Sequence, residues 1–473
     1  MKNRESRPII FLLILVLISR IPFLFAGYGS EEDAWALPLV AERIAETGQY
    51  EVSRFPGHPV QEIIYSTCWQ GGYLLFNTLT LLLSTAGIIA FTLTLKNFNI
   101  PNYLAGGFAL AFTPILYINS TNDMDYAWAL GIILIAGFLI SSKNYFLAGC
   151  MLALAVGCRI TSGAMLLPYS IIIYTISPAS NKISDTFRFI ITTLTGSLLV
   201  FTPVFINYGT DFFTYYEHFP IPGFLKNLYK GTIAVWGVTG MLAIVIGSIK
   251  FLINRKVPQA AILGEKNITK TVLGISVLTI ALYSISFARV PLKSAFMLPA
   301  APFIVLIFIL ILNKKQFQFF TIAFVFSCFF FGVNLAEANR GSAVSKYAKI
   351  ISVSGQQVAI DPLNGLVPAD YSKRQSRTVF AKKIIEATQQ IHDKTIIIAG
   401  WWLADILVLQ RGHENNFISY KYYIDEPEIK WFHDNGYTIL FLEDQGAYND
   451  LRFRKKFTER YATRFAISSG KSF

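Results

Sequence analysis

Long apolar segments follow one another through the first 340 residues of this chain, with short polar connections between them. A helix of about 20 apolar residues crosses the hydrocarbon core of a membrane, which is about 30 Å thick. A chain built this way has few folds open to it, because lipid satisfies no backbone hydrogen bonds and spanning segments must therefore be helices or closed barrels. We predict about eleven spanning helices, at residues 8–26, 71–95, 101–119, 126–142, 144–158, 161–177, 187–207, 232–253, 270–287, 295–312 and 317–336.

Composition supports a membrane protein, since 53% of the residues are hydrophobic and 15% are charged, against about 25% charged in soluble domains. The net charge of +12 would suit a nucleic acid if the basic residues clustered on one surface. They fall instead in the short connections between apolar segments. There, by the positive-inside rule, they indicate which connections face the cytoplasm. We therefore predict no nucleic-acid partner and a multi-pass protein of the plasma (inner) membrane, with a cytoplasmic N-terminus and with residues 28–70 and those after about 337 outside.

The N-terminus combines a basic stretch, residues 1–7, with the apolar stretch 8–26. A signal peptide has this layout, but the length of the apolar stretch favours a retained span. Arg20, near its outer end, is expected to snorkel to the interface, or alternatively to reach a lipid phosphate. The four cysteines lie in or beside apolar segments, so neither a disulfide framework nor a zinc site is expected.

Three adjacent carboxylates, Glu31, Glu32 and Asp33, open the first outer loop, residues 28–70. Ser30 three residues before Asp33 fits a capping box and predicts a surface helix that ends at Gly48, with a kink at Pro38. Helix capping alone would explain one or two of these acids, because carboxylates are favourable near a helix N-terminus. Three acids at a membrane surface favour a functional role.

A second acidic group, Asp123 and Asp125, lies in the connection before the span at 126–142. Capping of that span is the simpler interpretation. Together, the two acidic loops would place carboxylates on both sides of a cleft at the outer mouth of the bundle.

Basic residues at the outer edge are few, and each should have a carboxylate partner or an anionic ligand. They are Arg54, Arg159, Arg289 and Lys293. A phosphate or pyrophosphate suits them, because a guanidinium group binds it through two parallel hydrogen bonds. Pairing with nearby carboxylates is an equal alternative for Arg54 and Arg159. His58, between Gly57 and Pro59, is expected to be a turn residue that contacts substrate at most.

After about residue 340 the apolar runs stop, and strand patterns alternate with helix patterns. We predict helices at 377–392, 401–410, 426–435 and 450–461, and strands at 394–399, 416–422, 437–442 and 462–468. This order indicates a small α/β domain, residues 341–473, on the extracytoplasmic side. It has no phosphate-binding glycine motif, so no nucleotide cofactor is assigned to it.

The order of these features resembles the GT-C class of polytopic glycosyltransferases, in particular the protein mannosyltransferase and aminoarabinose transferase type (glycosyltransferase family 39-like). The resemblance covers roughly residues 1–340 and is carried by residues 31–35, 48–59, 122–128, 155–159 and 289–299. It implies a membrane all-α catalytic domain of about eleven helices, with the C-terminal α/β domain added to it.

The resemblance also implies roles. The family's general base maps to Asp33, with Glu32 next, because this chain has Glu-Glu-Asp where many relatives have a plain acidic pair. Asp125 maps to the second acidic position. Glu31 and Asp123 join the substrate-binding residues.

The lipid-phosphate site maps to Arg289 and Lys293, with Arg54, His58 and Arg159 as further substrate contacts. The donor would be a polyprenyl-phosphate sugar and the acceptor a hydroxyl on a glycan, lipid or protein. The reaction would invert the anomeric centre. Some members use a divalent cation; Asp33 and Asp125 offer oxygen ligands for Mg²⁺ or Mn²⁺, although no spacing requires one.

Three other classes stay open. A lipid-linked saccharide flippase or other transporter would carry ionisable groups at mid-membrane depth, whereas here they collect on one face. An O-antigen ligase or polymerase would have its large outer loop late in the chain. The spans could also merely anchor a C-terminal binding module, but so many spans exceed what an anchor needs.

Overall fold

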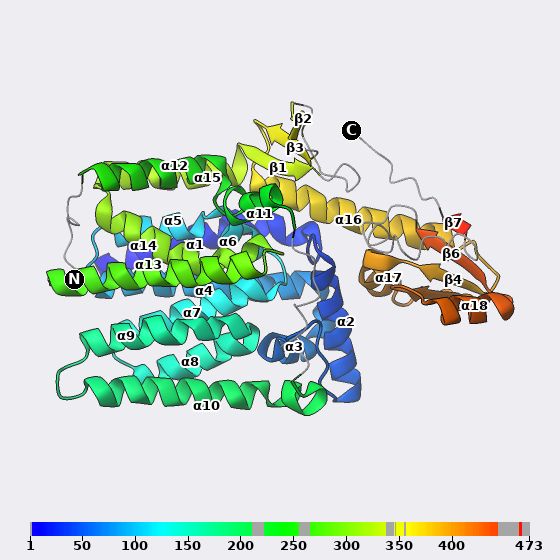
Figure 1. Ribbon diagram of the computed structural model, residues 1–473, viewed down its shortest axis with the longest axis horizontal. Coiled ribbons are helices and arrows are strands. Elements are labelled where there is room, and N and C mark those ends of the chain that lie inside the picture. The colour runs from blue at the N-terminus through cyan, green and yellow to red at the C-terminus, as the bar shows by residue number, and fades with distance from the viewer. Residues whose placement is uncertain are drawn as a thin grey trace.

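The computed structural model describes residues 2–210, 222–254, 265–336, 345, 347–353, 356–442 and 463–465. The described chain is mostly helical, and Figure 1 shows the helices of its first two thirds lying side by side in one bundle. Six helical segments are long and apolar enough to cross a membrane: Arg7–Ala26, Trp69–Asn97, Lys182–Tyr208, Ile233–Ile253, Ile268–Arg289 and Ser294–Ile311. The expected number of about eleven spans is therefore not confirmed.

These segments are built from α1 (Lys2–Arg20) with η1 (Ile21–Ala26), η2 (Trp69–Gly71) with α4 (Gly72–Asn97), α10 (Lys182–Tyr208), α12 (Ile233–Asn254), α13 (Lys266–Arg289), and η7 (Ser294–Ala300) with α14 (Ala301–Ile311). The other expected spans are shorter helices: α5 (Tyr103–Ala111), α6 (Pro114–Asn119), α7 (Asp125–Ser141), α8 (Tyr145–Cys158), η3 (Ile160–Met165) with α9 (Leu166–Ile176), and α15 (Lys314–Phe329). The short helix α11 (Phe224–Gly231) precedes α12.

Two of the shortened spans have a clear local cause. The segment expected at 101–119 is interrupted at Thr113, which has extended backbone, because Pro114 begins α6 at a position where its missing N–H group is tolerated. The segment expected at 317–336 ends at Phe329, and the chain then enters the strand Gly332–Ala336.

Helix α7 packs against α4 through two glycines. A Cβ atom on Gly87 would lie 2.6 Å from the Cα atom of Gly131, and one on Gly131 would lie 2.8 Å from the carbonyl oxygen of Leu83. Small residues let the backbones of two membrane helices approach closely. This close packing fixes α7, which begins at Asp125.

Arg20 differs from its expected role. Its side chain is fully buried, and its guanidinium group donates to the hydroxyl of Ser120, 2.7 Å away, and to the carbonyl oxygen of Ala111. The prediction that Arg20 snorkels to the interface is therefore wrong, and the residue instead joins the end of α1 to the chain on both sides of α6.

At one end of the bundle lie α2 (Glu32–Thr47) and α3 (Pro59–Ser66), across the helix ends in Figure 1; this end is here called the polar end. Gly48 ends α2 in the left-handed conformation, as predicted, with its N–H group bonded to the carbonyl of Ile44. The predicted capping box is wrong: Glu31, not Ser30, is the N-cap residue, and no side chain caps the helix. Pro38 lies inside α2 and is buried.

The C-terminal part contains two sheets. An antiparallel sheet has the order β1 (Gly332–Ala336), β3 (Gln356–Asp361), β2 (Lys349–Val353), and it was not expected from the sequence. A parallel sheet has the order β5 (Ile418–Lys421), β4 (Thr395–Ile398), β6 (Thr438–Leu442), β7 (Thr463–Phe465). The latter agrees with the predicted α/β alternation, while the helix predicted at 450–461 lies outside the described residues.

Helices cover both faces of the parallel sheet. The face with Ile397 packs against α16 (Leu366–Thr388) and against η8 (Gly400–Trp402) with α17 (Leu403–Leu409). The face with Ile396 and Ile398 packs against α18 (Glu426–Asp434). Helix α16 is longer than predicted, and its first half lies against the bundle in Figure 1. Val367 of α16 and Ala404 of α17 belong to the buried apolar core of the bundle itself, so the two parts share a core.

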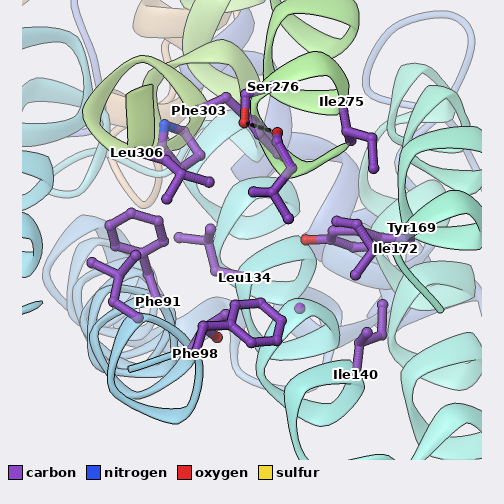
Figure 2. A pocket seen from close by; sticks show the side chains of 15 residues that line it. Phe91, Phe98, Leu134, Ile140, Tyr169, Ile172, Ile275, Ser276, Phe303 and Leu306 are labelled. Carbon is purple, nitrogen blue, oxygen red and sulfur yellow. Dashed lines mark hydrogen bonds between the residues drawn. The ribbon is translucent and has the colours of Figure 1, made fainter. Parts of the chain in front are cut away.

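An apolar cavity of about 60 Å³ lies inside the bundle, away from the polar end. Figure 2 shows the side chains that surround it, which come from α4, α7, α9, α13 and α14. Among them are Phe91, Leu134, Tyr169, Ile275 and Phe303. None of the predicted site residues lines it.

Candidate functional site

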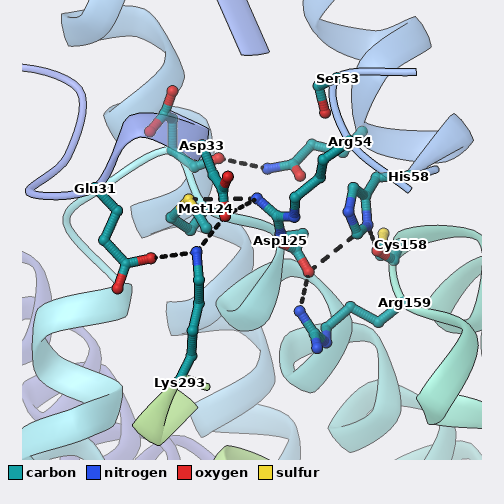
Figure 3. Close-up of polar contacts among 12 residues, drawn as sticks. Glu31, Asp33, Ser53, Arg54, His58, Met124, Asp125, Cys158, Arg159 and Lys293 are labelled. Atoms are coloured by element: carbon teal, nitrogen blue, oxygen red, sulfur yellow. Dashed lines mark hydrogen bonds and ion pairs between the residues drawn. The ribbon is translucent and has the colours of Figure 1, made fainter. Parts of the chain in front are cut away.

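Asp125 is the centre of a polar network at the polar end (Figure 3). Its carboxylate is buried and is contacted by Arg54 through one oxygen and by Arg159 through the other. His58 Nδ1 lies 3.7 Å from the carboxylate and 2.6 Å from the carbonyl oxygen of Cys158, to which it donates. Burial lowers the pKa of His58, so the imidazole is neutral and Nδ1 carries its proton. Asp125 therefore orients two guanidinium groups.

Lys293 is the centre of the other half of the network. Its ammonium group lies 2.6 Å from Glu31 and also contacts Asp33, and Figure 3 shows it pointing between the two carboxylates. Arg54 Nη1 lies 3.4 Å from Asp33, so Arg54 bridges Asp33 and Asp125. The result is a continuous chain of three acids and three cations.

The network is dry at one end and reachable by solvent at the other. The side chain of Asp125 is 1% exposed, whereas that of Asp33 is 29% exposed and that of Glu31 is 44% exposed. Burial alone would raise the pKa of Asp33, but the charges of Lys293 and Arg54 outweigh it and hold that pKa below its usual value. Asp33 is thus an ionised carboxylate at the rim of the site.

Two aromatic rings support Arg159. Its guanidinium carbon lies 4.3 Å from the ring centre of Tyr126 and 5.0 Å from that of Phe296. Such cation–π contacts are worth about 0.5–2 kcal/mol. They fix a third cation, with only 14% of its side chain exposed, beside Asp125.

The loop that carries Arg54 and His58 is held by Glu62. This buried carboxylate accepts hydrogen bonds from the Tyr50 hydroxyl at 2.5 Å, from the backbone and hydroxyl of Ser53 at 2.7 Å, and from the His58 N–H group at 2.9 Å. The backbone N–H groups of a loop have no regular secondary-structure partners. The Glu62 carboxylate supplies the acceptors for two of them, those of Ser53 and His58. The sequence alone indicates no role for Glu62.

Asp123 and Asp125 have different environments although they are two residues apart. The side chain of Asp123 is fully buried, and neither carboxylate oxygen has a hydrogen-bond partner among the described residues. Burial raises the pKa of Asp123 well above its usual value. The carbonyl of Asp123 accepts a hydrogen bond of 2.7 Å from the Gln61 amide. Asp123 lies behind the site and does not contact its cations.

Glu32 is turned away from the network. Burial, followed by the charge of Asp33, raises its pKa to about 8, and its other charged neighbours include Arg377 and Asp405 of the C-terminal part. Within the described chain Glu32 has no ion pair. At neutral pH it is protonated.

Arg289, like Asp123 and Glu32, is a predicted residue that the structure does not bring into the network. It ends α13 and is exposed, while Lys293, four residues later, reaches the carboxylates. No ion pair of Arg289 occurs among the described residues. Of the two alternatives given for Arg54 and Arg159, the structure shows the pairing with a carboxylate, Asp125.

A divalent cation does not fit this donor set. No group of three His, Cys, Asp or Glu side chains converges anywhere in the described ranges in a way that could hold a metal ion. Asp33 and Asp125, the expected ligands, are separated by the guanidinium group of Arg54. Each cation of the network is instead paired with a carboxylate.

Arg374 of α16 is a site neighbour that the sequence interpretation missed. Its side chain is buried and donates to the carbonyl oxygens of Gly27 and Thr121, each 2.8 Å away. A signal was present: Val367, Arg374, Ala381 and Thr388 recur every seven residues and are all buried. A basic residue on the apolar face of a helix indicates a buried partner.

Comparisons with protein families, with characterised proteins and with solved structures find no match to this chain. Its function has to be inferred from the site.

Proposed function

We propose that this protein is an integral membrane glycosyltransferase that moves a sugar from a polyprenyl-phosphate donor to an acceptor hydroxyl. One observation carries the proposal: Lys293, Arg54 and Arg159, from three distant segments, converge on carboxylates at the end of an apolar bundle. Cations at this place suit a phosphate whose lipid chain lies along the bundle. An ionised carboxylate beside them suits an acceptor that must lose a proton.

In this mechanism the donor phosphate competes with the carboxylates for the cations. Lys293 is the most exposed of the three cations, at 23% of its side chain, against 13% for Arg54 and 14% for Arg159. Arg159 is also held by Asp125 and two aromatic rings. Their charges stabilise the leaving phosphate, which is where negative charge develops in the transition state.

Asp33 is the proposed general base. As the acceptor oxygen attacks the anomeric carbon, a bond forms from that oxygen to the carbon and the bond from the carbon to the phosphate oxygen breaks. The hydroxyl proton passes to the Asp33 carboxylate, and the polyprenyl phosphate leaves with the electron pair. A single displacement inverts the anomeric centre.

The other acids have supporting roles in this proposal. Asp125 uses both oxygens to orient Arg54 and Arg159. Glu31 helps to hold Lys293, and Glu32, with its pKa of about 8, is the second candidate for the base. We place this reaction on the outer face of the plasma membrane, with the N-terminus in the cytoplasm and the C-terminal part outside, following the charge distribution of the loops.

The test is sugar transfer by purified protein from a panel of polyprenyl-phosphate sugars, with hydroxyl acceptors supplied, for the native chain and Asp33→Asn. We expect the native chain to consume a donor. Asp33→Asn should bind it but turn over at least about 100-fold more slowly, the lower end of the range for a general base.

If Asp33→Asn is as fast as the native chain, Asp33 is not the general base and Glu32 becomes the candidate. If no donor is consumed and the protein moves a lipid-linked saccharide across vesicle membranes, the protein is a transporter and the enzyme proposal is wrong.

A further inference from the structure

We infer that Arg374 is a positioning residue of the active site, which holds the two acidic loops at a fixed separation from the C-terminal part of the chain. The two loops are residues 27–33 and residues 121–125. The inference rests on the proposed function, because it assigns Arg374 a role in the placement of Asp33 and its cations. It gives the C-terminal part of the chain a place in the catalytic unit.

One guanidinium nitrogen makes the two decisive contacts. Arg374 Nη2 donates to the carbonyl oxygen of Gly27 and to that of Thr121, both at 2.8 Å, and Nη1 lies 3.4 Å from the Thr121 hydroxyl. Gly27 precedes the Glu31–Asp33 cluster, and Thr121 precedes Asp123 and Asp125. The same nitrogen therefore fixes the first residue of both loops.

Both loops are also held from the bundle side, so Arg374 completes a clamp. The Asn77 amide of α4 donates to the carbonyl of Gly27 at 3.0 Å, and the Gln61 amide of α3 donates to that of Asp123 at 2.7 Å. Trp35 Nε1 donates to the carbonyl of Gly29 at 3.1 Å. Arg374 is the member of this set that contacts both loops.

The contact requires α16 to lie directly on the first loop. Gly27 has φ of +99°, and a Cβ atom there would lie 3.0 Å from the hydroxyl of Thr378, one turn beyond Arg374. Tyr371, one turn before it, packs edge-on against Phe23 of η1, with ring centres 5.7 Å apart. Side chains on three successive turns of α16 therefore face η1 and the start of the first loop.

A lysine cannot replace this arginine. The guanidinium fork presents several donors in one plane and can bond several acceptors while fully dehydrated, whereas an ammonium group is a strongly hydrated point charge. Burying the charge is costly unless it is compensated. Here the compensation comes from the two carbonyls, from Asp370 at 3.9 Å and from the buried Asp123 carboxyl group nearby.

The expected consequence of loosening the clamp is a misplaced base. The contacts between Asp33 and both Lys293 and Arg54 depend on the separation of the loops, and a shift of about 1 Å in a catalytic group can cost about 100-fold in rate. Lys293, the most exposed of the cations, lies outside both loops and has no ion pair with Asp125 among the described residues, so donor binding should change less than turnover.

The experiment compares Arg374→Lys with Arg377→Lys in the full chain. Arg377 lies on the same helix and makes a bidentate ion pair with the buried Asp405, inside the C-terminal part. We expect both variants to lose thermal stability. Only Arg374→Lys should lose kcat, by about 10–100-fold, with the donor KM within about 3-fold and the acidic limb of its kcat–pH profile moved to higher pH.

Amide hydrogen exchange supplies a readout that needs no activity and that works on the native chain. Residues 27–33 and 121–125 should exchange slowly in the native chain and in Arg377→Lys, and faster in Arg374→Lys. If Arg374→Lys does not fold, fast exchange of these loops in the native chain would by itself overturn the clamp, and slow exchange would support it.

Equal kcat values for Arg374→Lys and the native chain would also overturn the inference. If the native chain transfers no sugar, the proposed function is contradicted. If the same chain still shows the predicted exchange pattern, the role of Arg374 in joining the two loops is supported.

Discussion

Asp33 combines two properties that conflict with a role as general base in the absence of a donor. It lies at the accessible rim of the site, where an acceptor can reach it, and it is paired with Lys293 and Arg54, which hold its pKa below the usual value. A paired carboxylate of low pKa is a weak base, since efficiency is greatest when the pKa lies near the working pH. Transfer of Lys293 from Asp33 to the donor phosphate would free the base only when a donor is present.

Lys293→Met tests this exchange of partners. Removing the ammonium group should raise the pKa of Asp33, so the acidic limb of the kcat/KM profile should move to higher pH by at least about one unit, which is the effect of a charge at contact distance. The donor KM should rise at the same time. Steady-state kinetics from pH 4 to pH 9 measure both.

Arg289→Gln is the matched control, since Arg289 is exposed on the same connection. A larger donor KM effect for Arg289→Gln than for Lys293→Met would contradict the assignment of the phosphate site.

Glu32 gives a prediction about stability. Its folded-state pKa of about 8 lies above its ordinary value of 4.5, so the folded state holds a proton that the unfolded state has lost. Stability must then fall as pH rises from about 4.5 to about 8. Glu32→Gln removes this dependence.

The variant should match the native chain near pH 4.5 and be more stable at pH 9, by on the order of 1 kcal/mol, discounted for partial solvent access. Thermal unfolding at the two pH values measures the difference. Parallel stability curves for the two proteins would show that Glu32 is not buried as a neutral acid.

At the scale of elements, the loop between α2 and α3 depends on Glu62. Glu62→Gln replaces one accepting oxygen by a donor and leaves several of the N–H and O–H groups of Tyr50, Ser53 and His58 without an acceptor. We expect a loss of about 2–3 kcal/mol, as for a hydrogen-bond set to a charged group, together with a fall in kcat, because Arg54 sits on this loop.

Glu51→Gln is the control from the same loop. Its carboxylate pairs with Arg43 at 2.6 Å, but both side chains are more than 40% exposed, and such pairs contribute about 0–1 kcal/mol. Thermal unfolding and kinetics of the two variants would show whether the effect comes from the lost hydrogen bonds of Glu62 or merely from removing one negative charge from the loop. Equal losses in both would contradict the role of Glu62.

The elements that could be predicted from the sequence are those with local signals. Gly48 marks the end of α2, Asp125 marks the start of α7, and the alternation after residue 390 gives the parallel sheet. Local patterns also predicted that Arg54 and Arg159 need anionic partners, because a basic residue at that edge is disfavoured without one.

The features that could not be predicted depend on distant contacts. The exclusion of Arg289 and the inclusion of Lys293 follow from how the connection after α13 folds, which no local pattern fixes. The antiparallel sheet pairs β1 with β3. The sequence between them shows neither a clear turn signal nor the alternation of apolar and polar residues that predicts a strand. The capping residue of α2 shifted by one position, within the usual uncertainty of helix ends.

At the scale of the whole molecule, the bundle and the C-terminal part share buried surface. Val367 and Ala404 lie in the core of the bundle, and Arg411 pairs with Glu42 of α2 at 2.5 Å. A chain that ends after residue 344 loses these contacts and exposes the apolar side chains beneath them.

We expect this truncated chain to unfold at a lower temperature in detergent than the native chain, and to show rapid amide exchange at residues 27–33. Unchanged melting and exchange would mean that the C-terminal part only rests on the bundle.

The contact between Lys293 and Glu31 joins residues that are 262 positions apart. A ribosome therefore delivers Glu31, Asp33 and Arg54 long before the residue that completes their ion pairs, and Arg374 follows later still. Until then the early acids face water as ionised carboxylates, whose usual pKa is about 4. Synthesis thus imposes an order on assembly, in which the acidic loops emerge first and their ion pairs can form only after Lys293 has been made.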